Sequence, residues 1–204
     1  MKTHIVGGGL AYEQLFFQLG HKLVDNVYDA DLLVFTGGED VSPHLYADSQ
    51  HRATFINVVR DAKEQRIFDA AVKKKKNMVG ICRGGQFLNV MNGGRMYQHV
   101  SKHCLDHMME DARTGQTFVV SSTHHQMMLP APDALLVATA ALHGTREWFD
   151  GDVPRNDVSD KDIEVVYYEK SRSLCFQPHP EFSVYGEYVD MHEYFSKLLK
   201  EFFK

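Results

Sequence analysis

The residues from 78 to 90 read MVGICRGGQFLNV, and this stretch decides the fold. Met78–Ile81 is an uninterrupted apolar run, typical of a buried strand, and the apolar spacing after it predicts a helix over Gly84–Met91. Cys82 lies at the junction, with a glycine two residues away on each side. Where a strand turns sharply into a helix the two backbones crowd together, so the flanking residues must be small. The stretch therefore predicts an elbow that holds a cysteine side chain above the edge of a sheet.

Strand-like and helix-like segments alternate on both sides of this elbow. Such alternation is typical of parallel βαβ units with helices on both faces of the sheet. The later strands have no long helical pattern between them, so we expect part of the sheet to be antiparallel or a second small sheet. The predicted strands are Thr3–Val6, His21–Val24, Leu32–Thr36, Met78–Ile81, Thr117–Ser121, Leu135–Ala140, Ile163–Tyr168 and Ser173–Gln177, and the predicted helices are Ala11–Leu19, Ala53–Lys75, Gly84–Met91 and about 188–203.

The helix predicted over Ala53–Lys75 is amphipathic. Its apolar residues near one face are Phe55, Val58, Val59, Ala62, Ile67 and Ala70. The basic block at residues 73–76 is expected to be the solvated last turn of this helix, where lysines complement the helix dipole. The polar segment 144–162 is expected to be a long loop, and loops of that length are usually functional or mobile.

The composition is that of one soluble globular domain over residues 1–204. Apolar residues make up 44% of the chain and charged residues 24%. The net charge of −5 favours neither a nucleic-acid nor a membrane partner. The three cysteines are an odd number without paired spacing, which indicates free thiols in a reducing compartment. No apolar run reaches the roughly 20 residues of a membrane span, and the N-terminal residues lack the apolar core of a signal peptide. We therefore expect a cytoplasmic protein.

The predicted elbow has the chemistry of an activated nucleophile. The N-terminus of the following helix stabilises a thiolate at Cys82, and the backbone N–H of Arg83 is placed to hold an oxyanion. Such a thiolate needs a base, and the base needs an orienting partner. QPHPE, at residues 177–181, follows a predicted strand and places His179 at a strand end, where α/β sheets build their sites. Glu181 can accept a hydrogen bond from the far ring nitrogen of His179.

GICRGGQFLNVMNGG and QPHPE together resemble the class I glutamine amidotransferase superfamily, which has a Cys-His-Glu triad in this chain order. Three further stretches are similar to the γ-glutamyl hydrolase branch, which includes the γ-glutamyl-γ-aminobutyrate hydrolases. These stretches are GGEDVSPHLY (37–46), VRDAKE (59–64) and SSTHHQ (121–126). The resemblance implies an α/β fold with a flavodoxin-like, mostly parallel central sheet, helices on both faces and a small antiparallel addition.

The resemblance also implies roles for particular residues. Cys82 would be the nucleophile, His179 the acid–base and Glu181 its orienting partner. Gly38 would supply the second N–H of the oxyanion hole beside Arg83. The residues that would contact the α-amino-acid end of a glutamyl substrate are Gln86, Thr123, His125 and Gln126. No metal or organic cofactor is needed for this chemistry.

The implied reaction starts with attack of Cys82 on the γ-carbonyl of glutamine or a γ-glutamyl amide. His179 then protonates the leaving amine, and water hydrolyses the resulting thioester. We narrowly favour an amidotransferase-type amidase that passes ammonia to a partner synthetase. The alternative is a free-standing hydrolase of γ-glutamyl amides or peptides. A catalytically inactive binding module is a third possibility, which the complete triad disfavours.

Four other patterns are weighed against simpler interpretations. GGGLAY (7–12) follows a strand but lacks the spacing of a dinucleotide-binding loop, so we favour a tight turn or flexible loop. His99, His103 and His107 recur every four residues, as metal ligands on one helical face would, yet we expect surface histidines there. His124 and His125 are rival candidates for the base. Trp148 and Phe149 are candidates for a lid, a partner contact or a local hydrophobic anchor.

Overall fold

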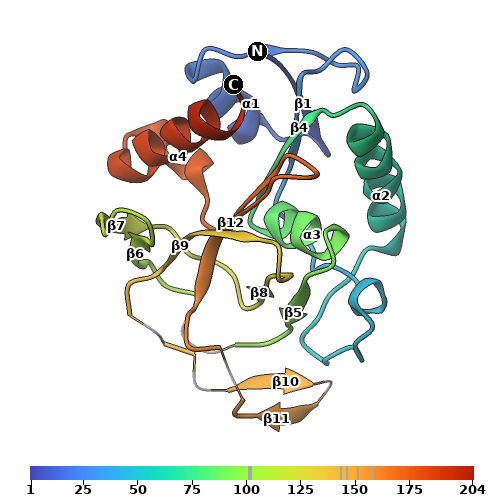
Figure 1. Ribbon diagram of the computed structural model, residues 1–204, viewed down its shortest axis with the longest axis vertical. Coiled ribbons are helices and arrows are strands. Elements are labelled where there is room, and N and C mark those ends of the chain that lie inside the picture. Colours follow the sequence, from blue (N-terminus) through green and yellow to red (C-terminus); the bar gives the residue numbers. More distant parts are fainter. Residues whose placement is uncertain (101–102, 143, 146, 151, 158) are drawn as a thin grey trace.

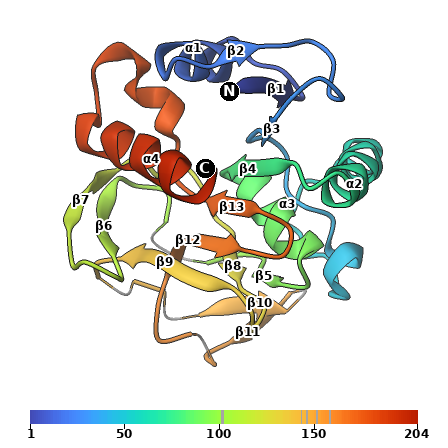
Figure 2. The ribbon, with the colours of Figure 1, turned by 45° about the horizontal axis from the view of Figure 1, so that its top comes forward.

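The computed structural model describes residues 1–100, 103–142, 144–145, 147–150, 152–157 and 159–204. Its centre is a sheet of nine strands (Figures 1 and 2). The strands, in spatial order, are β2 (Lys22–Leu23), β1 (Lys2–Val6), β3 (Leu32–Phe35), β4 (Asn77–Ile81), β13 (Ser173–Phe176), β12 (Ile163–Tyr168), β9 (Leu135–Ala140), β6 (His107–Asp111) and β7 (Thr117–Val120).

The two halves of the sheet differ in strand direction. Neighbouring strands from β2 to β13 run parallel, whereas each pairing from β13 through β12, β9 and β6 to β7 is antiparallel. The parallel strands β3, β4 and β13 are almost entirely buried, as expected for strands covered on both faces. The predicted α/β class with an antiparallel addition is confirmed, and the antiparallel strands extend the same sheet.

Helices cover both faces of the sheet. On one face α1 (Leu10–Gln18) and α4 (Val189–Phe202) pack through Leu15, Phe16 and Phe195 into one apolar core. On the other face α2 (Val58–Lys73) and α3 (Arg83–Met91) pack into a second core. None of the helices in the described part of the chain is both long and apolar enough to cross a membrane.

The prediction for the segment before the elbow was wrong in two respects. The helix α2 begins at Val58 rather than at residue 53, since the Asn57 side chain caps it by accepting a hydrogen bond from the Arg60 N–H. The expected apolar face is largely in solvent, because Phe55, Val58 and Val59 are 72%, 53% and 77% exposed. The inward face instead carries Asp61 and Glu64 beside Phe68 and Ala71. The basic block does lie at the end of α2, as expected.

The sequence patterns missed several short elements. The segment 144–162, expected to be a loop, contains an antiparallel pair, β10 (Trp148–Asp150) and β11 (Val153–Arg155). Trp148 packs on Tyr97 and Phe149 on His51, so both aromatic residues are anchors to the body of the protein. The other unpredicted elements are β5 (Arg95–Tyr97), β6, β8 (Met127–Leu129) and the 3-10 helices η1 (Pro43–Tyr46) and η2 (Pro180–Tyr185).

Candidate active site

Cys82 lies at a sharp turn between β4 and α3. Its φ and ψ are 52° and −116°, a positive-φ backbone conformation that side-chain-bearing residues rarely adopt. A Cβ atom on Gly80 would collide with the backbone of Gly84, and one on Gly84 would collide with the carbonyl of Phe35. The two glycines thus let the strand and helix approach closely. The predicted elbow is confirmed, and its strained residue is the cysteine.

His179 reaches Cys82 because β13 and β4 are parallel neighbours, paired through Phe176 and Ile81 at their ends. Both chains therefore leave the sheet at the same edge. The Nδ1 atom of His179 is 2.6 Å from Oε1 of Glu181, and Cys82 lies close enough to raise the pKa of the imidazole. The ring of Phe182 stacks on His179, with centroids 4.7 Å apart. The structure thus brings the three predicted catalytic side chains together.

The surroundings of His179 favour its protonated form. Burial alone would lower the imidazole pKa, but the Cys82 thiolate and the Glu181 carboxylate outweigh it and raise the pKa to about 10. Glu181 accepts a hydrogen bond from Nδ1 of His179, so the second ring proton is on Nε2 and faces Cys82 and Thr123. Oγ1 of Thr123 is 2.9 Å from this Nε2 atom. This arrangement can hold a thiolate–imidazolium pair and deliver a proton to a leaving group.

The two predicted oxyanion donors lie on the pocket that contains Cys82. Arg83 opens α3 directly after the cysteine. Gly38 has φ of +137°, and the Arg60 guanidinium occupies the place where a Cβ atom would stand, so a side chain does not fit there. The neighbouring Gly37 donates its N–H to the Tyr12 hydroxyl at 3.1 Å and is therefore already engaged. Gly38 remains the candidate on this loop.

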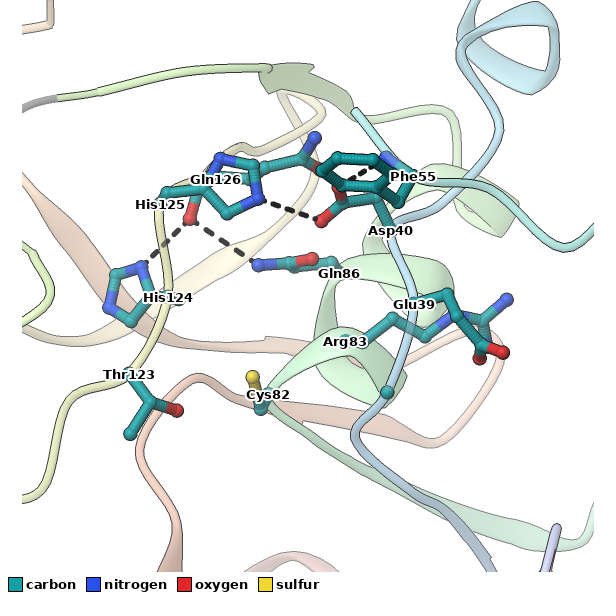
Figure 3. A pocket seen from close by; sticks show the side chains of 11 residues that line it. Glu39, Asp40, Phe55, Cys82, Arg83, Gln86, Thr123, His124, His125 and Gln126 are labelled. Carbon is teal, nitrogen blue, oxygen red and sulfur yellow. Dashed lines mark hydrogen bonds and ion pairs between the residues drawn. The ribbon is translucent and has the colours of Figure 1, made fainter. Parts of the chain in front are cut away.

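The predicted substrate contacts surround the same pocket, which Figure 3 shows with the Cys82 sulfur turned into it. Gln86 donates through Nε2 to the Gln126 carbonyl at 3.3 Å. The Gln126 side chain is fully buried and donates to Thr54, so this residue offers its backbone to the pocket. His125 pairs with Asp40 at 3.2 Å across the mouth. The lining residues are Gly38, Glu39, Asp40, Phe55, Cys82, Arg83, Gln86, Thr123, His124, His125 and Gln126.

Two residues near the site were not singled out from the sequence. Tyr12, in the GGGLAY stretch, lies beside Glu181, and burial with that carboxylate raises the pKa of its phenol. Gln177 is fully buried and accepts the second hydrogen bond of Gln86, at 3.1 Å. Gln177 stands in the QPHPE stretch, so its position was readable but its partner, distant in sequence, was not.

A buried charge network supports the elbow from behind. The Arg83 side chain turns away from the sulfur and forms ion pairs with Asp61 and Glu64 of α2. Arg60 pairs with Glu64 at 2.8 Å. It also donates to the Thr36 carbonyl at 2.9 Å, two residues before the predicted oxyanion donor Gly38. The VRDAKE stretch thus connects α2 to both predicted oxyanion donors.

The histidines outside QPHPE are arranged differently from the prediction. No helix forms in the described part of 98–107, and β6 begins at His107. His103, expected at the surface, is 2% exposed and contacts Asp162 at 3.0 Å. Of the rival bases, His125 is engaged by Asp40. His124 is buried, which lowers its pKa to about 4. The carboxylate that orients a base beside Cys82 is therefore found at His179.

Comparisons with known proteins agree with this fold. The glutamine amidotransferase-like protein YvdE of Lactococcus lactis is 27% identical over 212 residues, which cover 88% of this chain and 83% of YvdE. Protein NtpR of Enterococcus hirae is 30% identical over 174 residues, covering 74% of this chain and 66% of NtpR. A glutamine amidotransferase structure from Thermotoga maritima covers 100% of this chain and 90% of its own, with a TM-score of 0.62 and 15% identity.

A GMP synthase subunit from Thermoplasma acidophilum has the same fold, with a TM-score of 0.59 and 15% identity over 98% of each chain. Residues 16–181 match a family model, and this span includes both the elbow and QPHPE. The fold, the arrangement around Cys82 and this match lead to one assignment. The chain belongs to the Peptidase C26 family.

Proposed function

We propose that this protein hydrolyses the γ-amide bond of a γ-glutamyl substrate through a thioester on Cys82. One observation carries the proposal: Cys82 stands in a strained elbow on the wall of a pocket, beside a buried histidine that Glu181 holds at 2.6 Å and whose pKa is raised to about 10. In the family this chain belongs to, a hydrolytic or amidotransfer reaction is the expected use of such a site.

The proposed reaction assigns one role to each group. The Cys82 thiolate attacks the γ-carbonyl carbon, and the N–H groups of Arg83 and Gly38 hold the oxyanion that forms. The imidazolium of His179 gives its Nε2 proton to the departing amine, so that the C–N bond breaks and the thioester remains. Water then attacks the thioester while His179 takes its proton, which releases glutamate and restores the thiolate. Glu181 holds the ring in place throughout.

The charges at the pocket match one end of a glutamyl group. Asp40 and Glu39 lie at the mouth beside Gln86, where an α-ammonium group would meet acidic and amide oxygens. Glu39 is partly neutralised by Arg60 at 3.2 Å, and Asp40 lies 3.2 Å from Nε2 of His125. The Gln126 carbonyl faces the same space. These residues are the proposed substrate contacts.

The choice between a free-standing hydrolase and an ammonia-supplying amidase rests on the family resemblance. GGEDVSPHLY (37–46) and SSTHHQ (121–126) resemble the γ-glutamyl hydrolase branch, and residues 16–181 match a peptidase family model. We therefore favour a free-standing γ-glutamyl amide hydrolase. The second candidate is a glutaminase that supplies ammonia to a synthetase, which the name of the GMP synthase subunit with the same fold suggests.

The test is turnover of glutamine and a panel of γ-glutamyl amines by the purified chain, with the adduct on the protein followed by mass spectrometry. We expect faster turnover of γ-glutamyl amines than of glutamine, and no measurable turnover by Cys82→Ala. Cys104→Ser is the matched control, because Cys104 is an exposed free cysteine and should keep parental activity.

The outcomes separate the alternatives. Slow glutamine turnover that accelerates with a synthetase partner, together with no activity on γ-glutamyl amines, would favour the second candidate. A covalent adduct on Cys104 or Cys175 instead of Cys82, or full activity of Cys82→Ala, would contradict the assignment of the nucleophile.

A further inference from the structure

Behind the wall of the pocket, three buried side chains turn donor atoms toward one another. They are His103, His124 and Glu164, with exposed fractions of 2%, 3% and 0%. His103 precedes β6, His124 belongs to the segment that lines the pocket, and Glu164 lies on β12. Their donor atoms fall within 4.8 Å of one another. Three parts of the chain that are far apart in sequence thus meet at one point.

One atom of each of these side chains has no hydrogen-bond partner. The atoms are Nδ1 of His103, Nε2 of His124 and Oε2 of Glu164, all inaccessible to solvent. An unpaired buried polar atom costs about 1–3 kcal/mol, and native proteins keep such atoms rare. Three of them in one cluster call for a common partner, and a cation satisfies all three because each atom carries a lone pair.

The opposite nitrogen of each imidazole is already engaged in the way that metal-binding histidines require. Nε2 of His103 is 3.0 Å from Asp162, so the proton sits there and leaves Nδ1 as a lone pair. Nδ1 of His124 donates to the Gln126 carbonyl at 2.8 Å, which leaves Nε2 as a lone pair. Metal-ligating histidines almost always donate their other N–H to a carboxylate or a carbonyl. His107 supports the third ligand, with Nε2 at 3.1 Å from Oε1 of Glu164.

We propose that His103, His124 and Glu164 bind a divalent transition-metal ion, with Zn²⁺ the best match. Two imidazoles and one carboxylate are a typical zinc ligand set, whereas Mg²⁺ and Ca²⁺ prefer oxygen ligands alone. Donors around a tetrahedral zinc are about 2 Å from the ion and so about 3.5 Å apart. Nδ1 of His103 and Nε2 of His124 lie 3.6 and 3.9 Å from Oε1 of Glu164, the oxygen that His107 also contacts. Small side-chain rotations therefore suffice to place both nitrogens and a carboxylate oxygen on one ion.

The position of the site indicates a structural role. Figure 3 shows the His124 ring at the edge of the pocket, with Nδ1 turned to the Gln126 carbonyl. The ion would lie on the far side of that ring, next to Glu164. It would fasten the pocket-lining segment 123–126 to β12 and to the chain before β6. This role is independent of the chemistry proposed for Cys82.

The experiment measures metal content and thermal stability of the full chain with its purification tag removed. The protein is dialysed against a weak chelator, analysed for metals by plasma mass spectrometry, and melted with and without one equivalent of ZnCl₂. We expect about one zinc per chain and a zinc-dependent rise in Tm of about 5 °C or more. In His103→Gln and Glu164→Gln the metal content and the rise in Tm are lost.

The matched control is His99→Gln. His99 belongs to a separate histidine cluster at the pocket mouth, stacked on His51 and 3.3 Å from His125. This variant should keep its zinc. Absence of metal and of any Tm shift in the parent chain would overturn the proposal, and so would zinc lost on His99→Gln but kept by His103→Gln.

A second measurement uses the parent chain alone and so tests the proposal even if the variants fail to fold. The parent chain is loaded with Co²⁺, and its absorption and X-ray absorption spectra are recorded. Intense visible bands of a tetrahedral site with nitrogen and oxygen ligands alone support the proposal. A sulfur ligand at about 2.3 Å would place the ion on a cysteine and overturn it.

Discussion

His179 shows how one residue takes its properties from neighbours on distant parts of the chain. Its ring is fixed by Glu181 two positions away, but its charge also depends on Cys82, which follows another strand. Desolvation opposes the charged form and these two anions favour it. The result is a group that stays protonated well above neutral pH and can serve as the general acid for the departing amine.

Replacing Glu181 by Gln tests the balance at this residue. The variant keeps the shape of the side chain but loses its charge, so we expect kcat/KM to fall by about 100-fold. Because the carboxylate helps to raise the His179 pKa to about 10, its loss lowers that pKa. The alkaline limb of the pH–rate profile, where the imidazolium loses its proton, therefore moves to lower pH.

The measurement is a pH profile of kcat/KM from about pH 6 to about pH 11, a range that brackets the ordinary and the raised histidine pKa. Glu187→Gln is the control, since Glu187 lies exposed shortly after η2 and should reproduce the parental profile. An unshifted alkaline limb in Glu181→Gln would show that this carboxylate has no part in setting the pKa of His179.

At the scale of elements, a buried cluster of charges joins α2 to α3. Asp61 and Glu64 are each 2% exposed and both pair with Arg83, which is itself 2% exposed. A buried ion pair adds little net stability compared with apolar residues of similar size, but removing one partner leaves the other charge uncompensated. The backbone of Arg83 is thereby fixed where the oxyanion would form.

Arg83→Gln should lower the free energy of unfolding by about 3 kcal/mol, because two buried carboxylates lose their shared cation. Arg60 still compensates Glu64, which keeps the loss at the lower end of the usual range. Guanidinium unfolding followed by circular dichroism measures the change. Arg66→Gln, at an exposed position on the same helix, should lie within about 0.5 kcal/mol of the parent. Equal stabilities of the two variants would contradict the structural role of Arg83.

At the scale of the whole molecule, another buried carboxylate connects the antiparallel half of the sheet to the C-terminal helix. Asp111, at the end of β6, accepts from the Tyr194 hydroxyl of α4 and from the Arg113 guanidinium, both at 2.8 Å. Burial would raise the pKa of Asp111, but these hydrogen bonds and the charge of Arg113 hold it well below its ordinary value. The carboxylate is therefore more acidic in the folded than in the unfolded protein.

The sign of the pH effect follows from that shift. A lowered pKa adds stability that is fully present above the ordinary aspartate pKa of about 4 and is lost as the pH falls below it. We expect the Tm of the parent to fall from about pH 5 to about pH 3, and the fall to be smaller in Asp111→Asn, which should itself be less stable at neutral pH. Calorimetric scans across this range measure both effects. An identical pH dependence of the two proteins would contradict the shift.

Local patterns were sufficient for the elbow and for much of the fold. Strand, glycine, cysteine, glycine and helix lie within residues 78–90, and each of these elements depends on its immediate neighbours. The acidic inward face of α2 was misread, because an apolar pattern indicates burial and cannot show that buried Asp61 and Glu64 have a cation opposite. The short strands β5 and β8 also escaped, since each is stabilised by the other rather than by its own periodicity.

The sequence by itself determined that a cysteine stands at a sharp bend and that a histidine with a nearby carboxylate follows a later strand. The tertiary structure alone decided that β4 and β13 lie side by side, which brings these groups to one edge of the sheet. It also decided which buried polar side chains meet: His103, His124 and Glu164 gather because the chain before β6, the pocket-lining segment 123–126 and β12 converge in space. The physical reason is that contacts between distant segments depend on how strands pair, and strand pairing leaves no signal in the spacing of residues along one segment.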